Sequence, residues 1–223
     1  DGAPTARSMI FVTPDGERSM NTYLGACVEL GPEDVEEEKT KGARVTYFEG
    51  YLWDPPRAKE AIRLAAEQAH AAQREVAMTL SDPFCVDRYR EEFLDLMRSG
   101  TVDIVFANES EMKSLYQTAS FEAGLDAFRK DCKLGIVTRS EKGSVVVRGD
   151  ETIEVQPLEI AELVDTTGAG DLYAAGFLFG YTKGRSLDEC GALGSLAAGL
   201  IIQQIGPRPQ HSLKEKAQQH GLG

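Results

Sequence analysis

The chain has 223 residues, 42% hydrophobic and 27% charged, which suits one large domain or a core with a small appendage. Its formal net charge of −12 at pH 7 argues against non-specific nucleic-acid binding, which needs basic surface to neutralise phosphates. Its longest apolar stretches, such as residues 191–202, are too short to span a bilayer, so we expect no membrane partner.

The N-terminal part of the sequence predicts a β-hairpin. Residues 7–24 read as two strands around a Pro14-Asp15-Gly16 turn. Residues 30–43 form a charged connector with about one helical turn. The hairpin does not fit the alternation of strands and helices that follows, and we interpret residues 7–24 as a separate lid.

Strand-like and helix-like segments alternate from residue 43 onward. The predicted strands are 43–52, 75–82, 102–108, 134–140 and 143–156, the last being two strands joined by a Gly149-Asp150 turn. The predicted helices are 55–73, which has prolines at its start, 86–100, 169–182 and 187–204, with short helices before 130. This order implies a mainly parallel sheet with helices on both faces, and we expect an α/β core over residues 43–223.

Ligands of such sheets bind beyond the carboxyl ends of the strands. That rule selects Asp82, Asn108, Thr138 and the loop 165–171 as a candidate rim. The four cysteines are widely spaced without a CxxC pair, which indicates thiols in a reducing compartment and hence a cytoplasmic protein. The three histidines form no HExxH motif and no recognisable catalytic group, and the two near the C-terminus are expected to be solvated.

The loop DTTGAGD, residues 165–171, leads directly into an apolar helical segment. If residues 168–170 open that helix, their free N–H groups and the helix dipole favour an anion, above all phosphate. A carboxylate at Asp171 would repel phosphate unless it accepts the proton of an attacking hydroxyl group. The alternative is that Asp171 only complements the helix N-terminus. Tyr173 rules out a GxGxxG motif here, and the residues around Lys183 rule out a Walker A loop.

Residues 165–184, DTTGAGDLYAAGFLFGYTKG, resemble the C-terminal signature of the PfkB (ribokinase-like) carbohydrate and nucleoside kinases. The resemblance implies a ribokinase-like fold, with a small β lid beside the sheet. It also implies an anion hole formed by Gly168, Ala169 and Gly170, with Asp171 as the catalytic base.

Three other segments resemble family motifs. Residues 108–111 have the NxxE form, which implies that Asn108 and Glu111 organise Mg²⁺ and the phosphates, largely through water. Residues 137–144 resemble the VTxGxxG segment beside the nucleotide, with Ser140 where glycine is common, so Thr138 and Gly143 become candidate ATP contacts. Residues 195–209 are similar to the helix and glycine loop that flank adenine. They supply Ser195, where ribokinases often have Asn, and Gly206.

The activity implied by the resemblance is ATP-dependent transfer of the γ-phosphoryl group to a primary hydroxyl of a nucleoside or sugar. Residues 6–26 and 47–54 resemble bacterial adenosine-kinase-like members most closely, so adenosine is the expected acceptor. A ribokinase- or fructokinase-type sugar kinase and a non-catalytic nucleotide-binding relative are the alternatives. Expected cofactors are ATP and Mg²⁺, and a monovalent cation such as K⁺ beside Asp165 is the alternative to a structural role for that residue.

Family members carry an N-terminal section before the lid, with a substrate-gripping Asp and a Gly-Gly hinge. Nothing in residues 1–30 matches such a hinge, so we expect that this section, with several sheet strands, lies outside the given sequence. The lid hairpin offers an exposed strand edge that could pair with a second subunit, and a homodimer through the lid is the expected assembly.

Overall fold

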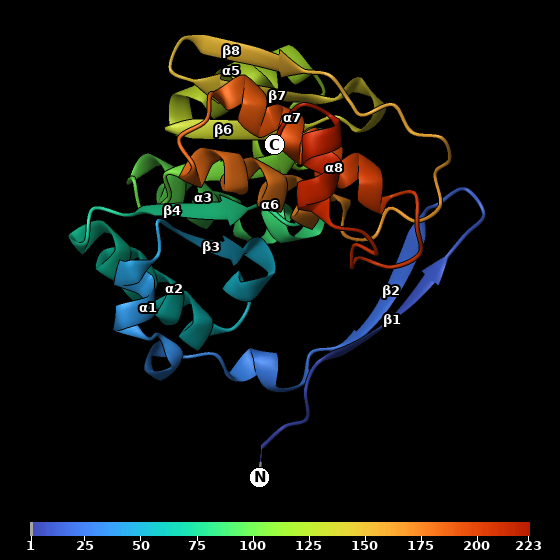
Figure 1. The fold of residues 1–223 in the computed structure, drawn as a ribbon. Coiled ribbons are helices and arrows are strands. Elements are labelled where there is room, and N and C mark those ends of the chain that lie inside the picture. The colour runs from blue at the N-terminus through green and yellow to red at the C-terminus, as the bar shows by residue number, and fades with distance from the viewer. Residues whose placement is uncertain (1) are drawn as a thin grey trace. The chain divides into compact units, whose positions relative to one another are not determined.

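The computed structural model describes residues 2–223, in which two sheets are present (Figure 1). A six-stranded sheet has the order β3-β4-β5-β6-β7-β8, and a two-stranded sheet pairs β1 with β2. Strands β3 and β4 are parallel, with Val45 opposite Glu75, and β4 and β5 are parallel, with Ala77 opposite Ile104. The strands are β1 Arg7–Val12, β2 Arg18–Tyr23, β3 Val45–Glu49, β4 Glu75–Thr79, β5 Ile104–Asn108, β6 Leu134–Thr138, β7 Ser144–Arg148 and β8 Glu151–Val155.

Helices connect most of these strands, as the alternating sequence pattern predicts. They are α1 Glu37–Gly42, α2 Pro56–Ala71, α3 Pro83–Arg98, α4 Glu109–Leu115, α5 Phe121–Asp131, α6 Ala169–Thr182, α7 Leu187–Ile201 and α8 Leu213–Gln219. Short 3₁₀ turns cover Gly25–Glu29, Pro32–Asp34, Gly50–Trp53 and Ser140–Lys142. The expected α/β class with a small β lid is confirmed, and the six-stranded sheet, expected to be mainly parallel, is mixed.

The chain divides into two compact units, and each is considered separately below. The first unit contains residues 24–137, residues 147–152 and the segment that ends at Arg7. The second unit contains residues 8–23, 138–146 and 153–223. The hairpin β1–β2 therefore belongs, for most of its length, to the same unit as α6 and α7.

The first unit is organised around the buried central residues of strands β4 and β5. Residues 76–78 of β4 and 104–106 of β5 are apolar and nearly fully buried, as parallel strands covered on both faces should be. Helix α3 begins at Pro83, three residues earlier than expected, because Asp82 caps it. The Asp82 carboxylate accepts from Phe84 N at 2.7 Å and from Cys85 N at 2.9 Å.

The second unit contains the helices α6 and α7, whose bounds follow the apolar sequence segments closely. Its last helix, α8, lies outside the sequence-based expectations. Only Ala217 of α8 is buried, where it joins a core cluster with Leu193 and Leu196 of α7. A seven-residue helix with one buried position has too little hydrophobic periodicity to be predicted.

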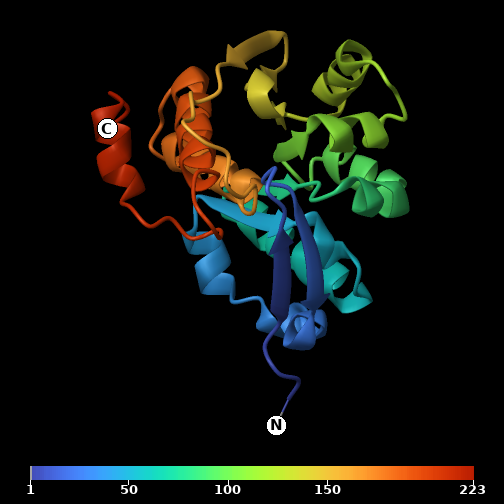
Figure 2. The same cartoon turned by 90° about the vertical axis from the view of Figure 1, so that its right-hand side faces the viewer.

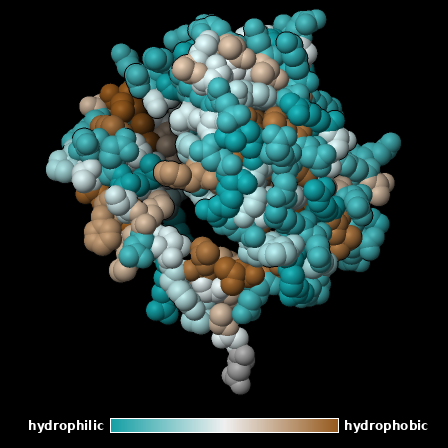
Figure 3. All heavy atoms as spheres, turned by 180° about the vertical axis from the view of Figure 1, so that it is seen from behind, coloured by the Kyte–Doolittle hydropathy of each residue, from teal (hydrophilic) through white to brown (hydrophobic). Residues whose placement is uncertain are grey.

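The hairpin β1–β2 forms an extended ribbon in both views (Figure 1, Figure 2). All residues of its two strands are exposed except Val12, which is half-buried. Within residues 2–223 no helix is long and apolar enough to cross a bilayer. The face shown in Figure 3 is mostly hydrophilic, with small apolar patches separated by polar side chains.

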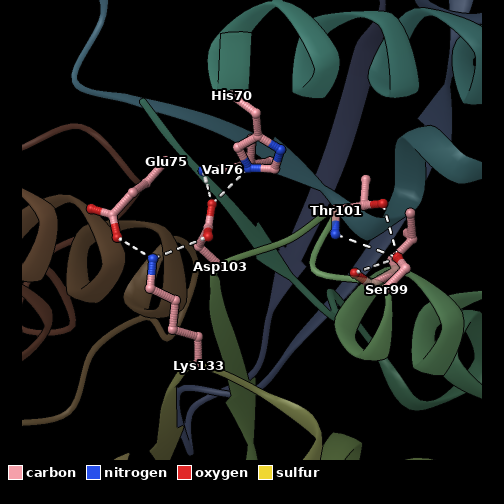
Figure 4. A network of polar contacts seen from close by, with 8 residues as sticks. His70, Glu75, Val76, Ser99, Thr101, Asp103 and Lys133 are labelled. Carbon is pink, nitrogen blue, oxygen red and sulfur yellow. Dashed lines mark hydrogen bonds and ion pairs between the residues drawn. The ribbon is translucent and has the colours of Figure 1, made fainter. Parts of the chain in front are cut away.

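In the first unit, a polar network centred on Asp103 joins α2 to the amino ends of β4, β5 and β6 (Figure 4). One carboxylate oxygen of Asp103 lies 2.9 Å from His70 Nε2 and accepts from Val76 N at 2.9 Å. The other lies 3.3 Å from Lys133 Nζ, which also contacts Glu75 at 3.2 Å. The side chain of Asp103 is only 13% exposed, so its loss would leave several polar groups without their partner.

We therefore expect Asp103→Ala to lower the free energy of unfolding by about 2 kcal/mol, because hydrogen bonds to a charged group are worth about 1.5–3 kcal/mol each and water replaces part of them. Urea denaturation measures this change. The control is Asp126→Ala, at an exposed position of α5. Equal losses in the two variants would contradict a stabilising role for the network.

Candidate active site

The loop DTTGAGD opens helix α6 as predicted. Gly168 is the N-cap, with φ +82°, and an added Cβ would lie 2.7 Å from the Cβ of Pro207. Leu172 N donates to Gly168 O at 2.9 Å, so Gly170 and the exposed Asp171 lie in the first turn. N–H groups of a first turn have no acceptor within their own helix, although Ala169 N donates to Thr166 O, outside the helix, at 3.2 Å. The geometry therefore offers main-chain donors and the positive end of a helix dipole to an anion.

Asp165 holds this loop from inside. It is 2% exposed, and its carboxylate oxygens accept from Thr167 N and Gly206 N, each at 2.8 Å. Burial alone would raise the pKa of Asp165, but these hydrogen bonds, together with the charge of Arg18, bring the pKa below its usual value. Asp165 is thus an ionised brace between the loop and residue 206, in agreement with a structural role.

The four candidate ATP contacts in the second unit differ in their position in the fold, their packing and their burial. Thr138 ends β6, and Gly143 follows the turn Ser140–Lys142 with its Cα so close to β8 that an added Cβ would lie 2.0 Å from Val155 O. Packing thus explains the glycine at position 143. Ser195 is only 9% exposed inside α7. Gly206 N is hydrogen-bonded to Asp165 of the loop 165–171, the candidate phosphate-binding loop, which is called the phosphate loop below.

In the first unit, Asn108 and Glu111 form a capping box at the start of α4. Asn108 Oδ1 accepts from Glu111 N at 2.8 Å. In return, Glu111 accepts from Asn108 N at 2.8 Å and from Asn108 Nδ2 at 2.6 Å. The NxxE spacing therefore has a local structural function as well as any role toward a ligand.

Glu111 is nevertheless unusual for a capping residue, because it is 4% exposed. Burial raises its pKa to about 7. The hydrogen bond from Asn108 N opposes this shift, and the charges of Asp82 and Glu49 contribute to the raised value. Three carboxyl groups thus act on one another near the carboxyl ends of β3, β4 and β5. A cation would relieve their repulsion.

The oxygen-rich chemistry of this cluster suits Mg²⁺, which keeps several of its waters when bound to protein. Both oxygens of Glu111 already accept hydrogen bonds from Asn108. No group of three His, Cys, Asp or Glu side chains in residues 2–223 is placed to hold a metal directly. Contact with Mg²⁺ through water therefore fits the residues present.

The sequence analysis missed several residues of interest. Phe84, 81% exposed, and Tyr51, 54% exposed, follow the carboxyl ends of β4 and β3. Phe84 lies in the first turn of α3 and Tyr51 in the turn Gly50–Trp53, and the hydrophobic pattern of the sequence gives no sign that these aromatic side chains are exposed. In the second unit, Arg18 Nη1 donates to Thr166 Oγ1 at 3.1 Å, beside the phosphate loop. That contact joins residues 148 positions apart and has no local signal.

Of the cysteines and histidines, Cys85 lies beside the carboxylate cluster, because its N–H donates to Asp82. Cys85, Cys132 and Cys190 are buried free thiols, and Cys27 is an exposed one. The two C-terminal histidines are exposed, as expected. The third histidine pairs with Asp103, a partner that lies 33 positions away.

The raised pKa of Glu111 has a consequence for stability. The folded state holds the Glu111 proton up to about pH 7, whereas an unfolded glutamate releases it near pH 4.3, so wild-type stability falls as pH rises between these values. We expect Glu111→Gln to gain stability relative to wild type over this window, by about 3 kcal/mol. Urea unfolding at pH 5 and pH 8 measures the difference.

The matched control is Glu189→Gln, in the capping box of α7. Hydrogen bonds from Ser186 lower the pKa of Glu189, so its contribution to stability changes only below about pH 4.3, and this variant should show no pH trend relative to wild type between pH 5 and pH 8. The same pH trend in both variants would contradict the assignment of the effect to the burial of Glu111.

Comparisons with known proteins agree with this geometry. The structure matches adenosine kinase from Sinorhizobium meliloti with a TM-score of 0.97 and 69% identity, covering 99% of this chain and 68% of that one. Arabidopsis thaliana ribokinase, solved with ribose and ATP, matches with a TM-score of 0.76 and 25% identity over 97% of this chain and 69% of that one.

Among curated proteins, Saccharomyces cerevisiae adenosine kinase is 30% identical over 214 residues, 85% of this chain. The chain spans 59% of the length of that relative. The model of the pfkB family of carbohydrate kinases matches residues 1–213. The chain belongs to the pfkB family of carbohydrate kinases.

Proposed function

We propose that the protein transfers the γ-phosphoryl group of ATP to a primary hydroxyl group of a nucleoside, adenosine. The observation that carries the proposal is the N-terminus of α6, where main-chain donors of residues 168–170 and the exposed carboxylate of Asp171 occupy one helical turn. Donors suit the charge of a transferring phosphoryl group, and a carboxylate suits the proton that its acceptor must lose.

The reaction is an in-line displacement at phosphorus. Asp171 accepts the proton of the attacking hydroxyl group while a new oxygen–phosphorus bond forms and the bond to ADP breaks. The N–H groups of Gly168, Ala169 and Gly170 stabilise charge on the transferring group. Arg18, whose guanidinium lies beside Thr166, adds positive charge at the same loop.

Nucleotide and metal roles are assigned by the same proposal. Thr138, Gly143, Ser195 and Gly206 contact ATP, and Asn108 and Glu111 organise Mg²⁺ through water. When bound, Mg²⁺ neutralises phosphate charge. A monovalent cation such as K⁺ beside Asp165 is supported by the buried hydroxyl of Thr167, which has no hydrogen-bond partner among the residues described.

Adenosine is favoured as acceptor by the similarity to the Sinorhizobium meliloti adenosine kinase and by exposed aromatic side chains in the first unit. A purine can stack on Phe84 or Tyr51, whereas a small sugar gains less from such surfaces. The competing acceptor is a sugar such as ribose, which the Arabidopsis ribokinase structure contains together with ATP.

The proposal includes a homodimer formed through the hairpin. Its strands expose Met9, Phe11, Met20 and Tyr23, each more than half exposed. Apolar side chains on an open two-stranded ribbon favour pairing with a second subunit.

We expect Asp171→Asn to lower kcat by about two to four orders of magnitude, the usual contribution of a general base, and to leave ATP affinity nearly unchanged. Coupled measurement of ADP release with adenosine, together with calorimetric titration of ATP, tests both parts. The control is Asp188→Asn, an exposed first-turn aspartate of α7. Retention of kcat in Asp171→Asn would exclude Asp171 as the base.

We expect Phe84→Ala to raise KM for adenosine about tenfold, because stacking of a base on an aromatic side chain is worth about 1–3 kcal/mol. KM for ATP should stay within about twofold of wild type, since less than 0.5 kcal/mol is then lost. Steady-state kinetics measures both constants. Phe179→Ala, at a half-exposed position of α6, is the control, and equal KM values for wild type and Phe84→Ala would contradict stacking at this residue.

A further inference from the structure

The turn of the hairpin contacts the segment that enters the phosphate loop, within the second unit. Gly16 O accepts from Thr166 N at 3.1 Å and from Thr166 Oγ1 at 3.1 Å. Arg18 Nη1 donates to the same Thr166 hydroxyl at 3.1 Å. One hydroxyl group therefore donates to the turn and accepts from the first residue of β2.

Packing reinforces these hydrogen bonds. Gly16 has φ +81°, and an added Cβ would lie 2.8 Å from Cγ of Leu163. Thr13 and Glu17 close the turn, with Thr13 N donating to Glu17 O at 2.8 Å. The main chain of the turn is therefore pressed against residues 163–166, and only glycine at position 16 allows this approach.

The rest of the hairpin has little to hold it in place within this unit. Its strands are almost fully exposed, and a two-stranded ribbon is marginally stable by itself. The contacts at Thr166 therefore contribute a large share of what fixes the hairpin relative to α6. Removal of the Thr166 hydroxyl group should therefore loosen both the hairpin turn and the loop that leads into α6.

The opposite side of the same segment is also fixed. Asp165 is bound to Gly206 N and Thr167 N, and Gly168 packs against Pro207. Thr166 is thus held between the hairpin turn and the residues that aim the N–H groups of the loop. With only Thr167 between Thr166 and the N-cap Gly168, a displacement of Thr166 would reach the anion-binding groups.

We propose that Thr166 is a positioning residue, which couples the lid hairpin to the phosphate loop so that phosphoryl transfer is efficient only when the hairpin is docked. This inference rests on the proposed function. It adds that the hairpin acts on the loop and does not serve only as a cover or as a dimer surface.

The test compares Thr166→Val, which keeps the β-branched shape and the main-chain hydrogen bond, with Thr166→Ser, which keeps the hydroxyl group. We expect Thr166→Val to lower kcat with adenosine about tenfold, the value of one to two lost hydrogen bonds, with KM for ATP within about twofold of wild type. Thr166→Ser should stay within about threefold of wild type, since it loses only a methyl contact. Thr182→Val, which removes a hydroxyl bonded to Leu178 O at the other end of α6, is the control.

A double-mutant cycle that combines Thr166→Val with Gly16→Ala distinguishes coupling between these two residues from two independent losses of kcat. If both residues act through one contact, Gly16→Ala combined with Thr166→Val should be no slower than the slower single variant. Wild-type kcat in Thr166→Val, a Thr166→Ser variant as slow as Thr166→Val, or fully additive losses would each overturn the proposal.

If the wild-type protein transfers no phosphoryl group, that result counts against the proposed function alone. Hydrogen exchange then still tests whether Thr166 couples the hairpin to the loop. Exchange in Thr166→Val should then become faster both at amides 13–18 and at amides 167–171, relative to Thr182→Val. Faster exchange in only one of these segments, or in neither, would overturn the coupling.

Discussion

The candidate site depends on one buried carboxylate. Asp165 is almost inaccessible to water, yet two main-chain N–H groups keep it charged, and they belong to the phosphate loop and to residue 206. An uncompensated charge in this position would be very costly, so the loop cannot move away from Gly206 without losing a hydrogen bond to an ion. This constraint fixes Gly168 against Pro207 and sets the direction in which α6 begins.

A chain with a net charge of −12 can still provide a phosphate site, because the attraction is local. Main-chain N–H groups at the start of α6 and the guanidinium of Arg18 act over a few ångströms, and salt screens charges beyond about 8–10 Å. In the first unit the local charge is negative, because Glu111 is buried near the carboxyl groups of Asp82 and Glu49. The second unit is thus suited to an anion and the first unit to a cation.

Local patterns predicted the parts of this structure that local forces determine. Helix α6 starts at Ala169, as expected, because a glycine N-cap followed by an apolar run leaves few alternatives. The capping box of Asn108 and Glu111 is also local, but the burial that shifts the pKa of Glu111 depends on tertiary packing. The contact of Thr166 with Gly16 joins residues 150 positions apart, and no local pattern encodes it. The resemblance to a known family indicated the loop, a candidate base and a structural role for Asp165, whereas the partners of Asp165 and the hairpin contact required the structure.

The most direct test of phosphoryl transfer is mass spectrometry of the products formed from Mg·ATP with adenosine, ribose and fructose in parallel. It should be carried out on this chain and on a fusion of this chain with the part of the Sinorhizobium meliloti adenosine kinase that the match leaves uncovered. Our account predicts adenosine monophosphate and ADP in equal amounts, with the phosphate on the primary hydroxyl. ATP cleavage to ADP and inorganic phosphate in both proteins, without a phosphorylated acceptor, would contradict it.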